Sequence, residues 1–228
     1  MKVTVVIPAY NAEKTIGNII DKCVKMSDEV IIINNNSIDN TFATACNHNV
    51  LARNQYIQGQ GAATRLGWDL ATEIECDTII TLDADGQHNP EEIPVLLAPI
   101  VENRADLVVG SRFISKHPKY YVPVYRKFGI DIINFIFNVF NNIKLIDTQS
   151  CFRAYTRKAF TTLKIKENGF GFSTELLIKA RKQGLRIVEV PITCIYHNEL
   201  KNNSTLNPIK HGIIVAWKTL YWRLKLWN

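Results

Sequence analysis

The 228-residue chain lacks long apolar runs, internal repeats and low-complexity segments. No uninterrupted apolar stretch approaches the ~18 residues that cross a bilayer, so we expect no transmembrane segment. Strand-like residues 2–7 follow Met1 directly, and we therefore expect no signal peptide. The chain is long enough to bury a sizeable core, so these absences predict one domain without a flexible linker.

Cysteine and glycine are too sparse for two common kinds of site. The five cysteines are odd in number and show no Cys-x-x-Cys spacing, which argues against a disulfide framework or a zinc site. We expect them to be buried thiols in a reducing compartment. Gly59 and Gly61 form a G-x-G that lacks the third glycine and follows no clear strand, so the sequence does not predict a dinucleotide fingerprint.

Charge of one sign is in only modest excess. The content of 46% hydrophobic and 21% charged residues is ordinary for a globular protein. The net charge of +6 favours anionic partners such as a nucleotide, a phosphate or a membrane surface. Basic residues form no run interleaved with aromatics except in the C-terminal segment, so nucleic acid is not an expected partner.

The first half of the chain alternates apolar strand patterns with helical patterns. The expected strands are Val3–Ile7, Val30–Ile33, Val50–Arg53, Thr78–Leu82 and Leu107–Val109. The expected helices are Ala12–Met26, Thr41–His48, Ala62–Ile74 and Glu91–Ile100. This alternation predicts an α/β fold, Rossmann-like, with a mostly parallel sheet and helices on both faces.

Polar residues follow the expected strands at the points where they end. They are Pro8–Glu13, Asn34–Asp39, Asp83–Asp85 and Gly110–Arg112. Each segment taken alone is consistent with a turn and a helix cap. Because ligands of parallel sheets bind beyond the carboxyl ends of the strands, we expect these segments to surround one site.

The fourth expected strand ends at two carboxylates. Side chains alternate along a strand, so Asp83 and Asp85 leave it on the same side. Paired carboxylates suit Mg²⁺ or Mn²⁺ carrying a diphosphate, and Gln87 offers a third oxygen. The alternative is an acidic turn before a helix that Asn89 caps. His88, like His197, is expected to be an exposed loop histidine rather than a ligand.

Together these segments resemble the family-two inverting glycosyltransferases of the GT-A fold, and within them the dolichyl- or polyprenyl-phosphate sugar synthases. The resemblance runs from Val3 to about Asn207 and rests on the order and spacing of its motifs. The matching segments are Val6–Glu13, Asn36–Thr41, Gly59–Gly67, Asp83–His88, Gly110–Arg112, Asp147–Arg153, Ser173–Glu175 and Val188–Ile192.

The resemblance implies an inverting transfer of one sugar from a UDP- or GDP-linked donor to polyprenyl (dolichyl) phosphate. The implied nucleotide-sugar pocket consists of Pro8, Ala9, Tyr10, Asn11, Glu13, Asn34, Asn36 and Asp83. The implied ligands of Mg²⁺ or Mn²⁺ are Asp83, Asp85 and Gln87. The implied acceptor-phosphate residues are Arg112, Arg126, Arg153 and Lys201, and the catalytic set is Asp85, Arg112, Arg126 and Arg153.

The chemistry of a phosphate acceptor agrees with arginines at that position. A phosphate monoester has a second pKa near ~6, so it is mostly dianionic at neutral pH and already nucleophilic. The enzyme then supplies orientation and charge neutralisation rather than a base. Guanidinium forks match phosphate oxygens, which favours Arg112 and Arg126 over lysine at these positions.

Two segments of the second half have membrane character. Residues 124–143 form a nearly all-apolar helical pattern. Ile209–Trp227 mixes aliphatics with three tryptophans, a tyrosine and four basic residues, as in a helix that lies in the bilayer interface. The alternative is a helix that docks on the domain or on a partner subunit. We expect a peripheral protein on the cytoplasmic face of a membrane.

The expected organisation follows from these patterns. A GT-A domain covers residues 1–207, with a nucleotide-binding half over 1–110 and an acceptor half over 111–207. An amphipathic, membrane-interfacial helix covers residues 208–228.

The chain departs from the family pattern at three places, of which Cys151, where the family usually has glycine, is a small change in local packing. Asn34 and Asn35 replace the usual acidic pair, and because an amide both donates and accepts, uracil and guanine stay open as the donor base. The loop Tyr196–Leu206 has only Lys201 where the family often has arginine, which leaves its acceptor contact open.

Two other functions are compatible with the same fold. Transfer to a hydroxyl of a glycan or a lipid-linked saccharide would need a base, for which Glu175 or Asp147 is the candidate. A non-catalytic nucleotide-sugar-binding protein would be consistent with Asn34 and Asn35, although the intact Asp83 and Asp85 argue against it.

Overall fold

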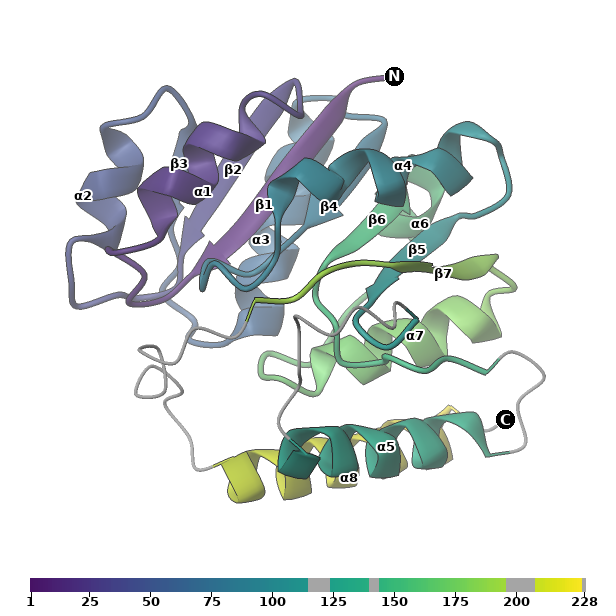
Figure 1. The fold of residues 1–228 in the computed structure, drawn as a ribbon. Helices are drawn as coiled ribbons and strands as arrows, with labels where there is room; N and C mark the ends of the chain where they lie inside the picture. Colours follow the sequence, from purple (N-terminus) through teal and green to yellow (C-terminus); the bar gives the residue numbers. More distant parts are fainter. Residues whose placement is uncertain (115–123, 140–143, 196–207, 227–228) are drawn as a thin grey trace.

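The computed structural model describes residues 1–114, 124–139, 144–195 and 208–226. Within these residues the chain forms a seven-stranded sheet in the order β3-β2-β1-β4-β6-β5-β7 (Figure 1). The strands are β1 (Val3–Ala9), β2 (Glu29–Asn34), β3 (Leu51–Asn54), β4 (Thr78–Thr81), β5 (Leu107–Ser111), β6 (Arg153–Thr156) and β7 (Ile187–Pro191). The helices are α1 (Ile16–Cys23), α2 (Thr41–Cys46), α3 (Gln60–Glu73), η1 (Pro90–Glu92), α4 (Ile93–Val101), α5 (Val124–Asn138), α6 (Arg157–Thr162), α7 (Phe172–Lys182) and α8 (Pro208–Lys225).

The mixed α/β class and the mostly parallel sheet are confirmed. All five expected strands are present, and the four expected helices lie between them. The first helix is shorter than its pattern, because the backbone N–H groups of Thr15 and Ile16 both donate to the carbonyl of Ala12 and form a turn before α1. The expected strands did not include β6, which enters the sheet antiparallel between β4 and β5.

Strand direction places the candidate site residues on one edge of the sheet. β1 pairs in parallel with β2 and with β4, so their carboxyl ends share an edge. β6 runs antiparallel to both β4 and β5, so β5 has the direction of β4. Arg153, at the start of β6, is opposite Thr81 at the end of β4 and Val109 in β5. We call this side the carboxyl edge.

The two faces of the sheet bury separate apolar clusters. In β1, Val5 and Ile7 point to the layer of α1 and α4, and Val6 points to the layer of α3 and α7. This follows from the alternation of side chains along a strand. Figure 1 shows the two helical layers on opposite sides of the sheet. The strands are therefore apolar throughout, as the sequence pattern predicts for a covered parallel sheet.

Helices α5 and α8 form a further layer below α7 (Figure 1). The Arg223 guanidinium of α8 donates to the backbone carbonyls of Ile136, Phe137 and Val139. The last turn of a helix leaves carbonyls that the helical pattern does not pair, and side-chain donors such as this guanidinium bind there. α8 thus docks on the domain through one side, with Val215, Thr219 and Trp222 buried.

Gly67 permits the close approach of α3 to β1. A Cβ atom at this position would lie 2.2 Å from Cγ1 of Val6, which is itself fully buried. We therefore expect Gly67→Ala to lower the free energy of unfolding by about 1–3 kcal/mol through overpacking. Urea denaturation followed by circular dichroism measures the change.

Gly129 in α5 provides the matched control. A Cβ there would meet no atom within 4 Å, so Gly129→Ala adds only helix propensity and should stabilise the protein by about 1 kcal/mol. Equal stability of the two variants would show that α3 does not pack against β1 at this distance.

Candidate active site

The loops after β1 and β2 are tied to each other at the carboxyl edge. The backbone N–H of Asn11 donates to Oγ of Ser37 at 3.0 Å, and Oδ1 of Asn11 accepts from the backbone N–H of Ile38 at 3.0 Å. Asn11 and Asn36 adopt φ of 47° and 62°, a left-handed conformation that asparagine tolerates better than most residues. These two predicted nucleotide-site residues therefore belong to one rigid loop pair.

Glu13 strengthens the same loop pair. It is exposed, and its Oε2 accepts from the backbone N–H and from Nδ2 of Asn40 at 3.1 and 3.3 Å. Pro8 and Ala9 end β1 and Tyr10 begins this loop, with Ala9 buried and the other two half-buried. The structure thus brings the residues of this predicted pocket to one edge.

The amides that replace the family's acidic pair are both engaged. Asn34 is buried, and its Nδ2 donates to Oδ1 of Asn54 at 2.8 Å. Oδ1 of Asn35 accepts from the backbone N–H of Gly59 at 3.0 Å. These contacts join the ends of β2 and β3 to the start of α3.

The carboxylate pair lies directly after β4. Nε2 of Gln60 donates to Oδ1 of Asp83 at 2.7 Å, so the start of α3 holds the first carboxylate in place. Oδ1 of Asp85 accepts from the backbone N–H of Gln87 at 2.9 Å across Gly86, whose φ is +75°. A glycine suits this turn because a side chain at such a φ would be strained.

The pair is electrostatically unfavourable when it is fully ionised. Burial, and next the charge of Asp85, raise the pKa of Asp83 to about 7. The positive charges of Arg112 and Arg153 and a hydrogen bond from Cys151 act in the opposite direction. A divalent cation would relieve the repulsion, so Asp83 and Asp85 fit such an ion chemically.

Most other ligands of such an ion would come from a bound diphosphate and from water. Oε1 of Gln87, the predicted third oxygen, accepts a long hydrogen bond from Sγ of Cys194 at 3.9 Å. Across the described parts of the chain, no group of three or more His, Cys, Asp or Glu side chains could hold a metal ion. Two carboxylates leave positions for diphosphate oxygens and water.

His88 is not the exposed loop residue that the sequence suggested. Its side chain is buried and lies against the ring of Phe152, with centroids 5.3 Å apart. Burial, and next the charge of Arg112, lower the pKa of His88 to about 3, so the imidazole is neutral. Its backbone bridges to Cys194, which places the end of the segment 187–195 beside the carboxylates. The expectation was wrong because the antiparallel bridge covers the loop.

Arg112 lies at the same edge, immediately after β5, and is oriented by a buried carboxylate. Its Nε and Nη2 donate to Oδ2 and Oδ1 of Asp147 at 2.7 Å each, and its backbone N–H donates to Oδ2 at 3.0 Å. Asp147 is fully buried, whereas the Arg112 side chain retains some exposure. This two-pronged ion pair fixes the plane of the guanidinium.

Arg153 lies deeper than the sequence suggested for an acceptor contact. It is 1% exposed, and its guanidinium donates to the carbonyl of Thr148 at 2.8 Å and to Oγ of Ser173 at 2.5 Å. Its positive charge acts to lower the pKa of Asp83. The side chain of Arg126 and all of Lys201 lie outside the described residues, so their acceptor contacts stay predictions, as does that of the loop Tyr196–Leu206.

The two candidate bases are both engaged in the structure. Glu175 is fully buried, accepts from the backbone N–H groups of Lys166 and Glu167, and pairs with Lys179 at 2.5 Å. Asp147 accepts two hydrogen bonds from the Arg112 guanidinium. Neither arrangement favours a residue that must accept a proton from a substrate hydroxyl.

Gln60 and Cys151 are the site residues that sequence reasoning missed. Gln60 also donates to Sγ of Cys151 at 3.3 Å, so the two surround Asp83. Gly61 allows this placement: its N–H donates to the carbonyl of Asn168 at 2.7 Å, and a Cβ there would lie 2.2 Å from the carbonyl of Glu167. The available signal was the glycine pair flanking a polar residue at a helix start.

The mostly parallel sheet thus carries paired carboxylates and an oriented arginine at its carboxyl edge. A profile of the family "Glycosyl transferase family 2" matches residues 4–163. The chain therefore belongs to glycosyl transferase family 2.

Two named relatives match over nearly the whole chain. A "UDP-N-acetylglucosamine--dolichyl-phosphate N-acetylglucosaminyltransferase" of Methanococcus voltae is 33% identical over 97% of this chain and 94% of its own. An "Undecaprenyl-phosphate mannosyltransferase" of Micrococcus luteus is 29% identical over 99% of this chain and 100% of its own.

Solved structures agree with the fold. Glucosyl-3-phosphoglycerate synthase from Mycobacterium tuberculosis, crystallised with Mn²⁺, UDP and phosphoglyceric acid, superposes with a TM-score of 0.75 at 18% identity. The match covers 99% of this chain and 78% of that one. The GT-A architecture expected from the sequence is therefore confirmed.

The raised pKa of Asp83 predicts how metal-free stability depends on pH. In the folded chain this pKa is about 7, against about 4 for an unfolded aspartate. The folded state thus binds the proton more tightly, and the stability from this group, fully present below about pH 4, is lost as the pH rises to about 7. Asp83→Asn cannot ionise, so we expect it to be more stable than the wild type at about pH 8 with chelator, and equally stable near pH 4. Urea unfolding at both pH values measures this.

Asp106 is the control of opposite sign. Its hydrogen bond from Arg186 lowers its pKa, so its contribution is present above the unfolded pKa and lost as the pH falls. Asp106→Asn should therefore be less stable than the wild type at about pH 8. The raised pKa of Asp83 is refuted if Asp83→Asn gains no stability there.

Proposed function

We propose that the protein transfers one sugar from a UDP- or GDP-linked donor to a polyprenyl (dolichyl) phosphate, with inversion at the anomeric carbon. The observation that carries the proposal is the shared edge of Asp83, Asp85 and Arg112. Carboxylates suit a cation on the donor diphosphate, and a guanidinium held by a buried partner suits an acceptor phosphate. The names of both relatives described above, which specify dolichyl and undecaprenyl phosphate, support the same acceptor class.

The reaction needs no protein base. An oxygen of the acceptor phosphate forms the bond to the anomeric carbon, while the bond from that carbon to the donor diphosphate breaks. Arg112 orients the attacking phosphate and reduces its repulsion from the donor, and Arg126, Arg153 and Lys201 are the further predicted contributors of positive charge. The engaged carboxylates of Glu175 and Asp147 agree with a base-free reaction. They argue against transfer to a hydroxyl.

Asp83 and Asp85 would hold Mg²⁺ or Mn²⁺, with Gln87 as a third protein oxygen. When bound, such an ion neutralises charge on the leaving diphosphate. Gln60 keeps Asp83 in place before the donor arrives. The loops that contain Tyr10, Asn11 and Asn36 would enclose the nucleotide.

The reaction is tested with purified protein, Mn²⁺, a phosphorylated polyprenol and a panel of UDP- and GDP-sugars. We expect mass spectrometry of the organic phase to find a lipid monophosphate that carries one sugar. Asp85→Ala should abolish the product, because one carboxylate cannot hold the ion, and chelator should do the same.

Asp69→Ala is the matched control for this assay. Asp69 is an exposed carboxylate on α3, and its loss should leave the rate within about twofold of the wild type. Sugar that reaches only a glycan acceptor would refute the lipid acceptor. Full activity of Asp85→Ala would refute the metal assignment.

We also propose that the protein is peripheral and contacts a membrane surface through α8 together with α5. Each helix carries a stripe of exposed apolar side chains opposite its buried side. On α5 these are Phe128, Ile132 and Phe135, and on α8 they are Ile213, Ile214, Trp217, Leu220, Tyr221 and Leu224. We call these residues the apolar face. Within the described residues, no helix combines the length and apolar character that would let it cross a membrane.

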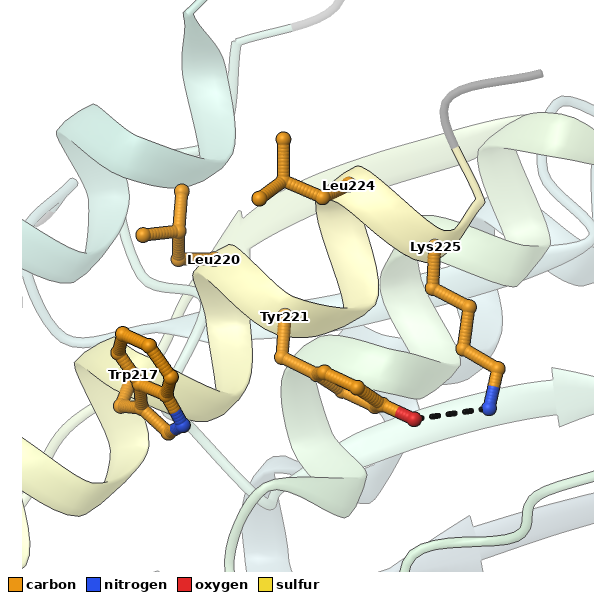
Figure 2. Close-up of a pocket in the computed structure, with 5 residues that line it drawn as sticks. All are labelled: Trp217, Leu220, Tyr221, Leu224 and Lys225. Carbon is orange, nitrogen blue, oxygen red and sulfur yellow. Dashed lines mark hydrogen bonds between the residues drawn. The ribbon is translucent and has the colours of Figure 1, made fainter.

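Aromatic and basic side chains lie together on α8, as interfacial binding requires. Figure 2 shows a shallow apolar hollow lined by Trp217, Leu220, Tyr221, Leu224 and Lys225. Nζ of Lys225 donates to the phenol oxygen of Tyr221 at 2.9 Å at the rim of this hollow. Aromatic rings of this kind prefer headgroup depth, and lysine favours anionic lipid.

Membrane contact is tested by flotation with vesicles of phosphatidylcholine and phosphatidylglycerol. Trp217→Ser should reduce the vesicle-bound fraction about tenfold, since burying a large apolar side chain contributes about 1.5–3 kcal/mol. Val101→Ser on α4 is the control, because Val101 is 67% exposed and Trp217 is 68% exposed. Unchanged flotation of Trp217→Ser, or a stable dimer that covers this face in light scattering, would refute the proposal.

A further inference from the structure

The orientation of Arg112 depends on the position of Asp147. Three hydrogen bonds from Arg112 end on this one carboxylate, two from the guanidinium and one from the backbone. Asp147 is not part of a strand or helix, since it lies in the connection between α5 and β6. A residue in such a connection needs an anchor of its own to hold a partner in a fixed plane.

Glu189 on β7 is that anchor. Its carboxylate accepts from the backbone N–H of Ile146 at 2.9 and 3.1 Å and from the backbone N–H of Asp147 at 2.8 Å. β7 is paired in parallel with β5, and Glu189 is in register with Val109, three residues before Arg112. The contacts thus form one series. Glu189 on β7 binds the 146–147 backbone, and the Asp147 side chain binds Arg112, which follows the neighbouring strand β5.

We propose that Glu189 is a positioning residue for the acceptor phosphate, acting through Asp147 on Arg112. The inference rests on the proposed function, which gives the phosphate to Arg112. Glu189 itself touches neither substrate. Its role is to keep the Asp147 carboxylate where both prongs of the guanidinium meet it, which fixes the plane in which Arg112 meets the phosphate.

A carboxylate is required at this position, and an amide of the same size does not replace it. Oε1 accepts from both N–H groups, and Oε2 also accepts from the N–H of Ile146. Glutamine keeps one oxygen but places an NH₂ group opposite the N–H of Ile146, so two donors face each other and the 146–147 backbone shifts away. Glu189→Gln therefore changes the position of Asp147 with almost no change in volume.

Steady-state kinetics with polyprenyl phosphate as the varied substrate tests the proposal. Glu189→Gln should raise the acceptor KM roughly ten- to a hundredfold, with the nucleotide-sugar KM within about twofold of the wild type. Asp106→Asn is the control. Asp106 also accepts from a backbone N–H and pairs with an arginine, but with Arg186 at the opposite ends of β5 and β7. The Asp106→Asn variant should have a lower melting temperature than the wild type and an unchanged acceptor KM.

A double-mutant cycle separates positioning from a general loss of stability. In an Arg112→Ala background, Glu189→Gln should have no further effect on the acceptor KM, because the group through which it acts is gone. Additive effects, or an equal rise of both KM values, would overturn the proposal.

A readout without substrate keeps the test independent of the proposed reaction. The Nε–H proton of Arg112, assigned by its loss in Arg112→Lys, should exchange slowly with water in the wild type and at least about tenfold faster in Glu189→Gln. If the wild type transfers no sugar to polyprenyl phosphate but this exchange difference is present, the proposed function fails and the positioning stands. If the exchange rate is unchanged, the positioning fails whatever the reaction is.

Discussion

The repulsion between Asp83 and Asp85 is the constraint around which the carboxyl edge is built. A buried carboxylate beside another is costly, and each neighbour of Asp83 reduces that cost in a different way. Gln60 donates a hydrogen bond from the start of α3, and Arg112 and Arg153 contribute positive charge. Arg153 lies at this edge because β6 runs antiparallel to β4, which places its first residue opposite Thr81. These neighbours thus offset part of the repulsion between the two carboxylates.

Most acidic side chains near this edge anchor loops rather than perform chemistry. Glu175 holds the backbone at 166–167, Glu189 holds 146–147, and Glu92 accepts from the backbone N–H and hydroxyl of Thr193. Each carboxylate satisfies backbone donors that a loop leaves unpaired. The motif Ser173–Glu175 therefore suggested a catalytic base, whereas in the fold Glu175 holds a loop through its backbone N–H groups.

Periodicity and strand-end polarity were sufficient to predict five of the seven strands, the parallel half of the sheet and the presence of the carboxylate pair. These features are local, because Asp83 and Asp85 follow a strand of four buried residues. Asp85 itself lies in the turn after β4, so strand alternation alone does not set its direction. The insertion of β6, the burial of His88 and the depth of Arg153 depend on contacts between residues far apart in the chain. No local pattern encodes them. Gln60 was missed for the same reason, because its partner Asp83 is 23 residues away.

The apolar face and the carboxyl edge are connected through a short segment at 166–168. Glu167 pairs with Lys218 of α8 at 3.0 Å and accepts from the indole N–H of the buried Trp222 at 3.4 Å. The neighbouring Asn168 carbonyl accepts from Gly61, next to the Gln60 that holds Asp83. These contacts tie the position of α8 to that of Asp83. With α8 at the bilayer interface and a lipid phosphate as acceptor, as we propose, this link would set the depth at which donor and acceptor meet.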